Sequence, residues 1–210
     1  MTIVTGEPTG TEYRQPRVSL HLLRAARPRD GGQRISIGEL IRNLGEESFG
    51  WCLIVVGLIN MMPLPVGSNL VTALPAIILT WQMCRGWHYV HIPAFIARRD
   101  IDSTAFRRRV ASIRWLTARL ERVLRPRYQW IFAPAYYRAI AVMLFAISLA
   151  LFLPILGTGF ILASSIFTFA IGLIAEDGLV ALAGLGLGLI AAVFAATLLT
   201  VFTLGISGLF

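Results

Sequence analysis

The stretch that decides the fold reads Leu58-Ile-Asn-Met-Met-Pro-Leu-Pro-Val-Gly-Ser-Asn-Leu-Val-Thr-Ala-Leu74. It lies in the middle of residues 48–84, which contain no Asp, Glu, Lys or Arg. Proline has no backbone N–H to donate, and it disfavours helical geometry at the residue before it. Pro63 and Pro65 therefore break any helix that enters this stretch. In hydrocarbon such a break is tolerated only where protein or a water-filled cavity satisfies the freed backbone groups.

The distribution of charge predicts an all-α integral membrane protein. The chain of 210 residues is 56% hydrophobic, and its charges lie in residues 7–47, 85–138 and 176–177. Long charge-free tracts between charged blocks are typical of proteins that cross a membrane several times. Residues 1–34 are rich in Gly, Pro, Thr and Arg, and we expect a flexible basic cytoplasmic arm without a signal peptide. Residues 35–210 then form a single membrane domain.

The basic residues predict a lipid surface as the counter-charge. All 19 are arginine, and the net charge is +8. In residues 103–125 apolar side chains recur at spacings of three and four with arginines on the other faces, which predicts an amphipathic helix. Such a helix can bind nucleic acid or lie on anionic headgroups, and the long apolar tracts beside it favour membrane lipid and no nucleic acid. The residues expected at the lipid surface are Arg107, Arg108, Arg109, Arg114 and Trp115.

Helix signals divide the rest of the chain. Ser36 and Glu39 form a capping box, and Gly45 ends the short helix that follows. In the last apolar tract, Gly184 and Gly188 provide a small-residue face for close helix packing. The predicted helices span residues 37–44, 48–62, 68–84 with a kink at Pro75, a second broken pair within 139–175, and a C-terminal transmembrane helix over 178–206.

The two apolar tracts form an internal repeat. Residues 48–84 and 139–175 are each 37 residues long, and charges bound both. Pro63 and Pro154 each lie 16 residues after the charged border, so one offset of 91 aligns the borders and the breaks. A shared length together with a shared break favours duplication. The predicted parts are repeat one (36–84), an amphipathic linker (85–138), repeat two (139–176) and the C-terminal helix (178–206), each repeat being a broken or re-entrant helix hairpin.

The paired breaks predict a polar transport site. Breaks at corresponding positions of two halves mark the substrate site of many transporters. The helix that restarts after each break exposes backbone N–H groups and a positive dipole end, which suit anions or polar headgroups. We therefore expect a polar site with carboxylates nearby. Its expected residues are Asn60, Pro63, Pro65, Gly67, Ser68, Asn69, Gln82, Pro154, Gly157, Thr158 and Gly159.

Carboxylates at the borders of the tracts have two interpretations. The four are Glu46, Glu47, Glu176 and Asp177. They fit an ionisable gate at the mouth of a permeation path, but a carboxylate at a helix N-terminus also fits simple capping. His88 and His91 are spaced to face one metal ion, but no carboxylate or thiol completes the set, so neither a metal nor a cofactor is expected. No nucleophile–base pair is recognisable, so we expect no enzyme.

Orientation follows from the arginines. The segments on both sides of the first tract are arginine-rich, so both are expected on the cytoplasmic side. An even number of crossings follows, which favours hairpins and parallel repeats over inverted ones. Short hairpins need a partner to seal their breaks from lipid, so a homodimer is expected.

Several short motifs carry a resemblance to a known family. They are Ile35-Ser-Ile-Gly-Glu-Leu, Gly45-Glu-Glu-Ser-Phe-Gly50, Asn60-Met-Met-Pro-Leu-Pro65, Leu74-Pro75, the run from Glu121-Arg122 to Pro126-Arg127, and Glu176-Asp-Gly178. Over residues 35–188 the chain resembles the ExoD exopolysaccharide-synthesis family of bacterial inner-membrane proteins. The resemblance implies a link to exopolysaccharide production and to envelope or alkaline-stress fitness, without a known reaction. Two functions stay open: a transporter or exchanger of ions or small anions, and a non-transporting assembly or regulatory subunit that binds other exopolysaccharide-synthesis proteins.

Overall fold

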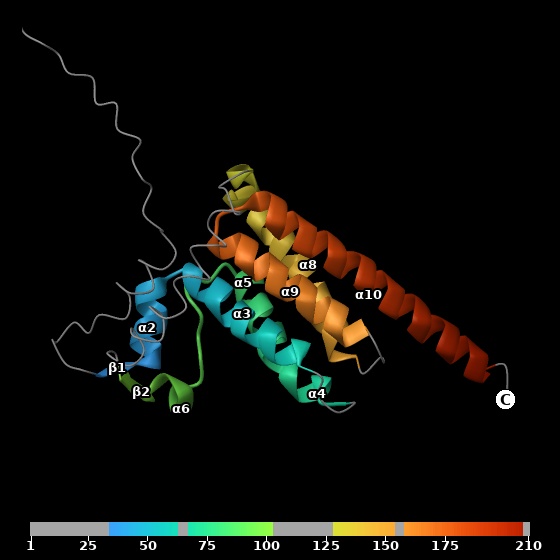
Figure 1. The fold of residues 1–210 in the computed structure, drawn as a ribbon, viewed down its shortest axis with the longest axis horizontal. Helices are drawn as coiled ribbons and strands as arrows, with labels where there is room; N and C mark the ends of the chain where they lie inside the picture. Colours follow the sequence, from blue (N-terminus) through green and yellow to red (C-terminus); the bar gives the residue numbers. More distant parts are fainter. Residues whose placement is uncertain (1–33, 63–66, 103–127, 154–157, 208–210) are drawn as a thin grey trace, which may run out of the picture.

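The computed structural model describes residues 34–62, 67–102, 128–153 and 158–207, and most of these residues are helical (Figure 1). This agrees with the all-α prediction. In chain order the elements are β1 (Arg34–Ser36), α2 (Ile37–Leu44), α3 (Glu47–Met61), α4 (Asn69–Thr72), α5 (Leu74–Cys84), α6 (Ala94–Ala97), β2 (Asp100–Asp102), η1 (Gln129–Phe132), α8 (Pro134–Phe152), α9 (Thr158–Ile174) and α10 (Gly178–Ser207).

Five long helices form the main bundle. α3 packs mainly against α9, α5 packs against α8, and α10 covers α9 and α8 (Figure 1). Large apolar side chains fill the space between them, among them Phe49, Leu53, Leu144, Ile147 and Phe169, all at most 1% exposed. Other apolar residues of the same helices face outward. A helix that is apolar on all sides is typical of a large core or of lipid surroundings.

α10 lies unusually close to α9 because glycines line the contact. A Cβ atom on Gly184 would lie 2.5 Å from the backbone nitrogen of Phe169, and one on Gly188 would lie 2.5 Å from Ser165 Oγ. These distances are shorter than real Cβ atoms tolerate, so only glycine fits. The predicted small-residue packing face of the last apolar tract is confirmed.

The same contacts show how far α10 extends beyond the start of α9. Gly184 faces Phe169 and Gly188 faces Ser165, and this antiparallel register, continued along the helices, puts Thr158, the first residue of α9, level with Ala195. Ala195 is fully buried. α10 continues for another 12 residues to Ser207, about 18 Å at the helical rise of 1.5 Å per residue. The side chains of this overhang that the structure describes are exposed.

A small unit beside the bundle corrects the purely helical prediction. β1 pairs with β2 as an antiparallel two-stranded sheet, and α2 and α6 pack beside it (Figure 1). Ile35 and Leu40, with Leu44 packed against them, form its own small core. Each strand has only three residues, which is too short for an alternating pattern to be visible in the sequence. Arg34, expected at the end of a flexible arm, is the first residue of β1, and residues 1–33 lie outside the described part.

The helix boundaries agree with the sequence signals. α2 follows the predicted cap, because Ser36 Oγ accepts a hydrogen bond from Glu39 N at 3.2 Å, and Gly45 ends the helix with a φ of +56°. The helix expected over residues 68–84 is interrupted at Ala73, where α4 ends and α5 begins. Pro75 explains the interruption, because it cannot donate to a carbonyl four residues earlier.

Candidate functional site

The helices that begin after the two breaks meet at one end of the bundle. Asn69 begins α4 after the first break, and Gly159 stands in the first turn of α9 after the second. A Cβ atom on Gly159 would lie 2.5 Å from Asn69 Nδ2, so the two positions touch although 90 residues separate them. Thr158 beside them is buried. Pro63, Pro65, Pro154 and Gly157, which were expected at this site, lie outside the described residues.

Asn60 closes the first hairpin. Its side chain is buried, and Nδ2 donates to Thr72 O at 3.0 Å and to Val56 O at 2.9 Å. Its Oδ1 accepts a hydrogen bond from Thr72 Oγ1 at 2.7 Å. These bonds tie the last turn of α3 to α4 across the break. The polar capacity of Asn60, predicted for transport, is used within the protein.

Ser68 has free capacity at the same break. Its Oγ is buried and has no hydrogen-bond partner among the residues that the structure describes. Gly67 before it has a φ of +93°, a conformation that side-chain-bearing residues rarely adopt. A buried polar group without a partner costs roughly 1–3 kcal/mol, so an unmatched hydroxyl indicates a place where a ligand or water binds.

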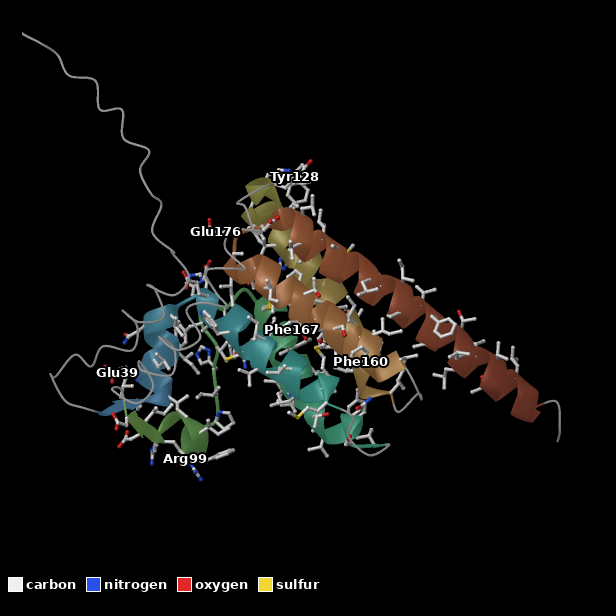
Figure 2. All side chains as sticks on the ribbon, in the orientation of Figure 1. Glu39, Arg99, Tyr128, Phe160, Phe167 and Glu176 are labelled. Atoms are coloured by element: carbon white, nitrogen blue, oxygen red, sulfur yellow. The ribbon has the colours of Figure 1, made fainter. Side chains whose placement is uncertain are left out.

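The charged ends of the helices gather at the opposite end of the bundle. Figure 2 labels Phe160 in the first turn of α9 and Glu176 just beyond its last residue, at the two ends of the bundle. α3 has 15 residues, about 22 Å at the helical rise, and this length separates its charged start from the break. The expected carboxylates near the breaks are therefore a wrong prediction. The structure holds two separate polar regions.

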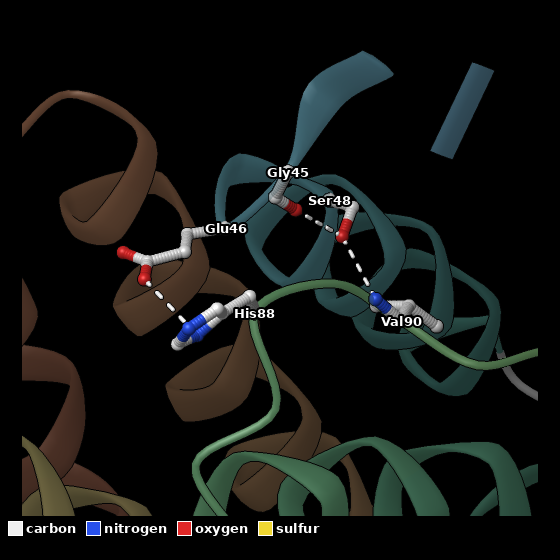
Figure 3. Close-up of polar contacts among 5 residues, drawn as sticks. All are labelled: Gly45, Glu46, Ser48, His88 and Val90. Carbon is white, nitrogen blue, oxygen red and sulfur yellow. Dashed lines mark hydrogen bonds and ion pairs between the residues drawn. The ribbon is translucent and has the colours of Figure 1, made fainter. Parts of the chain in front are cut away.

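A pocket of about 560 Å³ opens at this charged end. Residues from both halves line it: Glu46, Glu47, His88, Tyr137, Arg138 and Glu176 among them. His88 Nδ1 lies 3.8 Å from Glu46 Oε1, and both side chains are more than 80% exposed (Figure 3). A pair this exposed contributes little stability. Three of the four predicted gate carboxylates thus share one pocket.

Asp177, the fourth gate candidate, caps a helix. It is buried, and its Oδ1 accepts hydrogen bonds from Leu179 N at 3.1 Å and Val180 N at 3.4 Å. These are two of the first N–H groups of α10, which lack partners within the helix. The capping interpretation therefore describes Asp177. Glu47 lies in the first turn of α3, where its charge also favours the helix dipole.

Gln82 and Ser48 hold the loop that follows α5. Gln82 Nε2 donates to His91 O at 2.9 Å, and Gln82 Oε1 accepts from His91 N at 2.7 Å. Ser48 Oγ accepts from Val90 N at 3.1 Å and donates to Gly45 O at 2.5 Å (Figure 3). Gln82 lies two residues before the end of α5, away from the break, so its predicted place in the transport site is wrong. We call these hydrogen bonds to the loop the clamp, and no sequence motif predicts it.

We expect Gln82→Ala to release the loop. The change removes two hydrogen bonds to the backbone of His91, and because this residue is exposed, water replaces part of them. The loss is about 1 kcal/mol. Hydrogen exchange at the His91 amide should accelerate. Gln82→Glu keeps the acceptor for His91 N and should protect the amide better than alanine; equal exchange in both variants would contradict the clamp.

His88 and His91, whose spacing would let them face one metal ion, have different neighbours. The His91 ring lies 4.3 Å from that of Trp87 and stacks on Tyr89 at 4.6 Å, while His88 faces Glu46. Arg107, Arg108, Arg109, Arg114 and Trp115, expected at a lipid surface, lie outside the described part of the chain.

The fold, the candidate site and a family match together show what kind of protein this is. In the described residues, the chain is a mainly helical bundle with a pocket bordered by charged side chains at one end and, at the other end, a contact between the helices that follow the two breaks. One of its helices, Gly178–Val201 within α10, is long and apolar enough to cross a membrane. A family model described as "Exopolysaccharide synthesis, ExoD" matches residues 18–197. The chain belongs to this family, as its motifs indicated, and the family implies a role in exopolysaccharide synthesis. No curated protein and no solved structure matches it.

Proposed function

We propose that this ExoD-family protein is a multi-pass inner-membrane transporter or exchanger of ions or small anions that supports exopolysaccharide production. The observation that carries the proposal is the contact between Asn69 and Gly159, which joins two helix breaks from separate halves of the chain. Breaks inside an apolar bundle are tolerated where protein or a water-filled cavity satisfies the freed backbone groups, and breaks that correspond in two halves mark the substrate site of many transporters. The homodimer expected from the sequence belongs to this proposal.

The packing supports duplicated hairpins. α3 packs on α9, and α5 packs on α8. In a duplicated fold α3 corresponds to α8, and α5 corresponds to α9. A two-fold axis between two parallel hairpins would exchange these helices, and it would turn the α3–α9 pair into the α8–α5 pair, as observed. The offset of 91 in the sequence makes the same assignment of helices. Both hairpins then enter from the charged, cytoplasmic end and turn at the breaks.

The outward faces support surroundings of lipid. Exposed apolar side chains occur along α3, α5, α8, α9 and α10; examples are Val55 at 56%, Ile78 at 53%, Val142 at 54% and Ile190 at 72%. Apart from α10, the apolar helices have between 11 and 19 residues, roughly 16–28 Å, which is less than a hydrocarbon core of about 30 Å. Re-entrant hairpins beside one full-length helix fit these lengths.

The donors at the joined breaks favour an anion. Among the described residues Ser68 Oγ has no hydrogen-bond partner, and Asn69 offers a side-chain amide beside it. The charged pocket at the other end would serve as the aqueous entrance, with Glu46, Glu47 and Glu176 as its gate. Buried apolar residues such as Leu53 and Ile166 separate the two regions, so transport requires a rearrangement of the hairpins.

Flux into proteoliposomes tests the proposal. The wild-type protein should carry one of a panel of small anions or ions under a pH or anion gradient, and Asn69→Ala should reduce that flux about tenfold or more, because it removes a donor at the joined breaks. Thr197→Val, on the exposed face of α10, is the matched control and should leave flux unchanged. Absence of flux for every solute, together with stoichiometric recovery of a glycosyltransferase or polymerase on purification, would replace the transporter by the assembly subunit.

A further inference from the structure

The small unit of β1, β2, α2 and α6 presents an apolar surface that its own core does not use. Phe95 is 73% exposed and Ile96 is 38% exposed. Arg98 and Arg99, just after α6, are exposed as well. A unit whose core contains only a few aliphatic side chains would gain stability from burying a phenylalanine. None of the described residues covers it.

α6 is fixed against α2 in a way that holds Phe95 outward. Ile37 N donates to Arg99 O at 3.0 Å, directly after α6. A Cβ atom on Gly38 would lie 3.1 Å from the Cβ of Ala97, so Ala97 faces α2. Successive residues of a helix are 100° apart, which directs Ile96 and Phe95 away from that contact.

The unit is also tied to the bundle at two of its connections. Only two residues separate α2 from α3. On the other side, Ser48 and Gln82 hold the backbone of Val90 and His91, shortly before α6 begins. In Figure 1 α6 lies below α2, and in Figure 2 Arg99 lies at the outer edge of the unit. Phe95 therefore has a fixed place on a unit that joins the charged start of α3 through two residues.

We propose that α6 is an interfacial anchor: Phe95 and Ile96 enter the boundary between the acyl chains and headgroups of the leaflet at the charged end, and Arg98 and Arg99 contact lipid phosphates. Aromatic and aliphatic side chains favour this boundary, and arginine reaches the phosphates from it. Asp100, also exposed, follows the arginines, so the apolar pair supplies most of the binding. The occupant is a phospholipid surface. The inference rests on the proposed membrane position of the bundle.

Spin-label accessibility in phospholipid nanodiscs tests the anchor. The background is the full chain with Cys52→Ala and Cys84→Ala, which removes both native thiols. A nitroxide is placed at Ile96→Cys, at Arg42→Cys on the exposed face of α2, and at Ile190→Cys on α10 as the lipid reference. The label at position 96 should collide more often with oxygen than with a water-soluble nickel chelate, as at position 190, and the label at position 42 should show the reverse.

A second change separates insertion from local packing. Phe95→Asp, at an exposed position outside the unit's core, should leave the fold intact and shift the label at position 96 towards the behaviour at position 42. A nickel-accessible label at position 96 in the Phe95 protein overturns the anchor while position 190 still reports a membrane bundle. Shielding of position 96 from both reagents overturns it in favour of a protein partner. A nickel-accessible label at position 190 overturns the membrane position of the bundle and the anchor with it.

Discussion

Gly184→Val should destabilise the bundle by about 3 kcal/mol, at the upper end of the range for overpacked cores. The new Cβ would lie 2.5 Å from Phe169 N and 2.8 Å from Ser165 O, and both are backbone atoms of α9 that no rotamer change can move. α10 must therefore shift away from α9 along its length. Interfaces built on small residues derive their stability from this close approach, so the shift weakens every neighbouring contact.

Gly186→Val is the matched control, because a Cβ atom at Gly186 meets nothing within 4 Å. Both changes replace glycine by valine within the same helix, so the gain in helix propensity is the same. The difference in thermal unfolding temperature between the two variants, measured in one detergent, isolates the contact with α9. Equal unfolding temperatures would show that α10 does not pack on α9 through Gly184.

Gly159→Ala should lower flux about as strongly as Asn69→Ala, and the two effects should not add. The alanine methyl group would lie 2.5 Å from Asn69 Nδ2 and would push the amide out of the joined breaks. In an Asn69→Ala protein this amide is absent, so the methyl group meets no obstacle. The double variant should therefore carry solute at the rate of Asn69→Ala alone, which is the signature of direct contact in a double-mutant cycle.

Proteoliposome flux on the four proteins measures the cycle, at equal reconstituted protein and with the solute that the wild type carries. Gly186→Ala, on α10, is the control for a glycine-to-alanine change without a nearby group. Additive losses from Gly159→Ala and Asn69→Ala would mean that the two breaks act independently. The polar site would then not span both hairpins, and the joined breaks would be a packing contact.

The sequence was informative wherever the signal was local or periodic. The Ser36 cap, the end of α2 at Gly45 and the glycine face of α10 were readable because each depends on residue types a few positions apart. The contact of Asn69 with Gly159 and the clamp of Gln82 on His91 were not, because they join distant or pattern-free residues through tertiary packing. The distance between the carboxylates and the breaks could have been predicted, because a helix of 15 residues such as α3 places its two ends about 22 Å apart.

The overhang of α10 makes bilayer thickness a variable for this protein. At 30 residues the helix is about 45 Å long, against a hydrocarbon core of about 30 Å. Helices relieve such a mismatch by tilting, typically by about 20°, and by thickening the bilayer around them. Because α9 and α8 pack along α10, a tilt of α10 also inclines these helices. In the proposed transporter this changes the depth of the two breaks, and lipid acyl-chain length should therefore tune access to the proposed polar site.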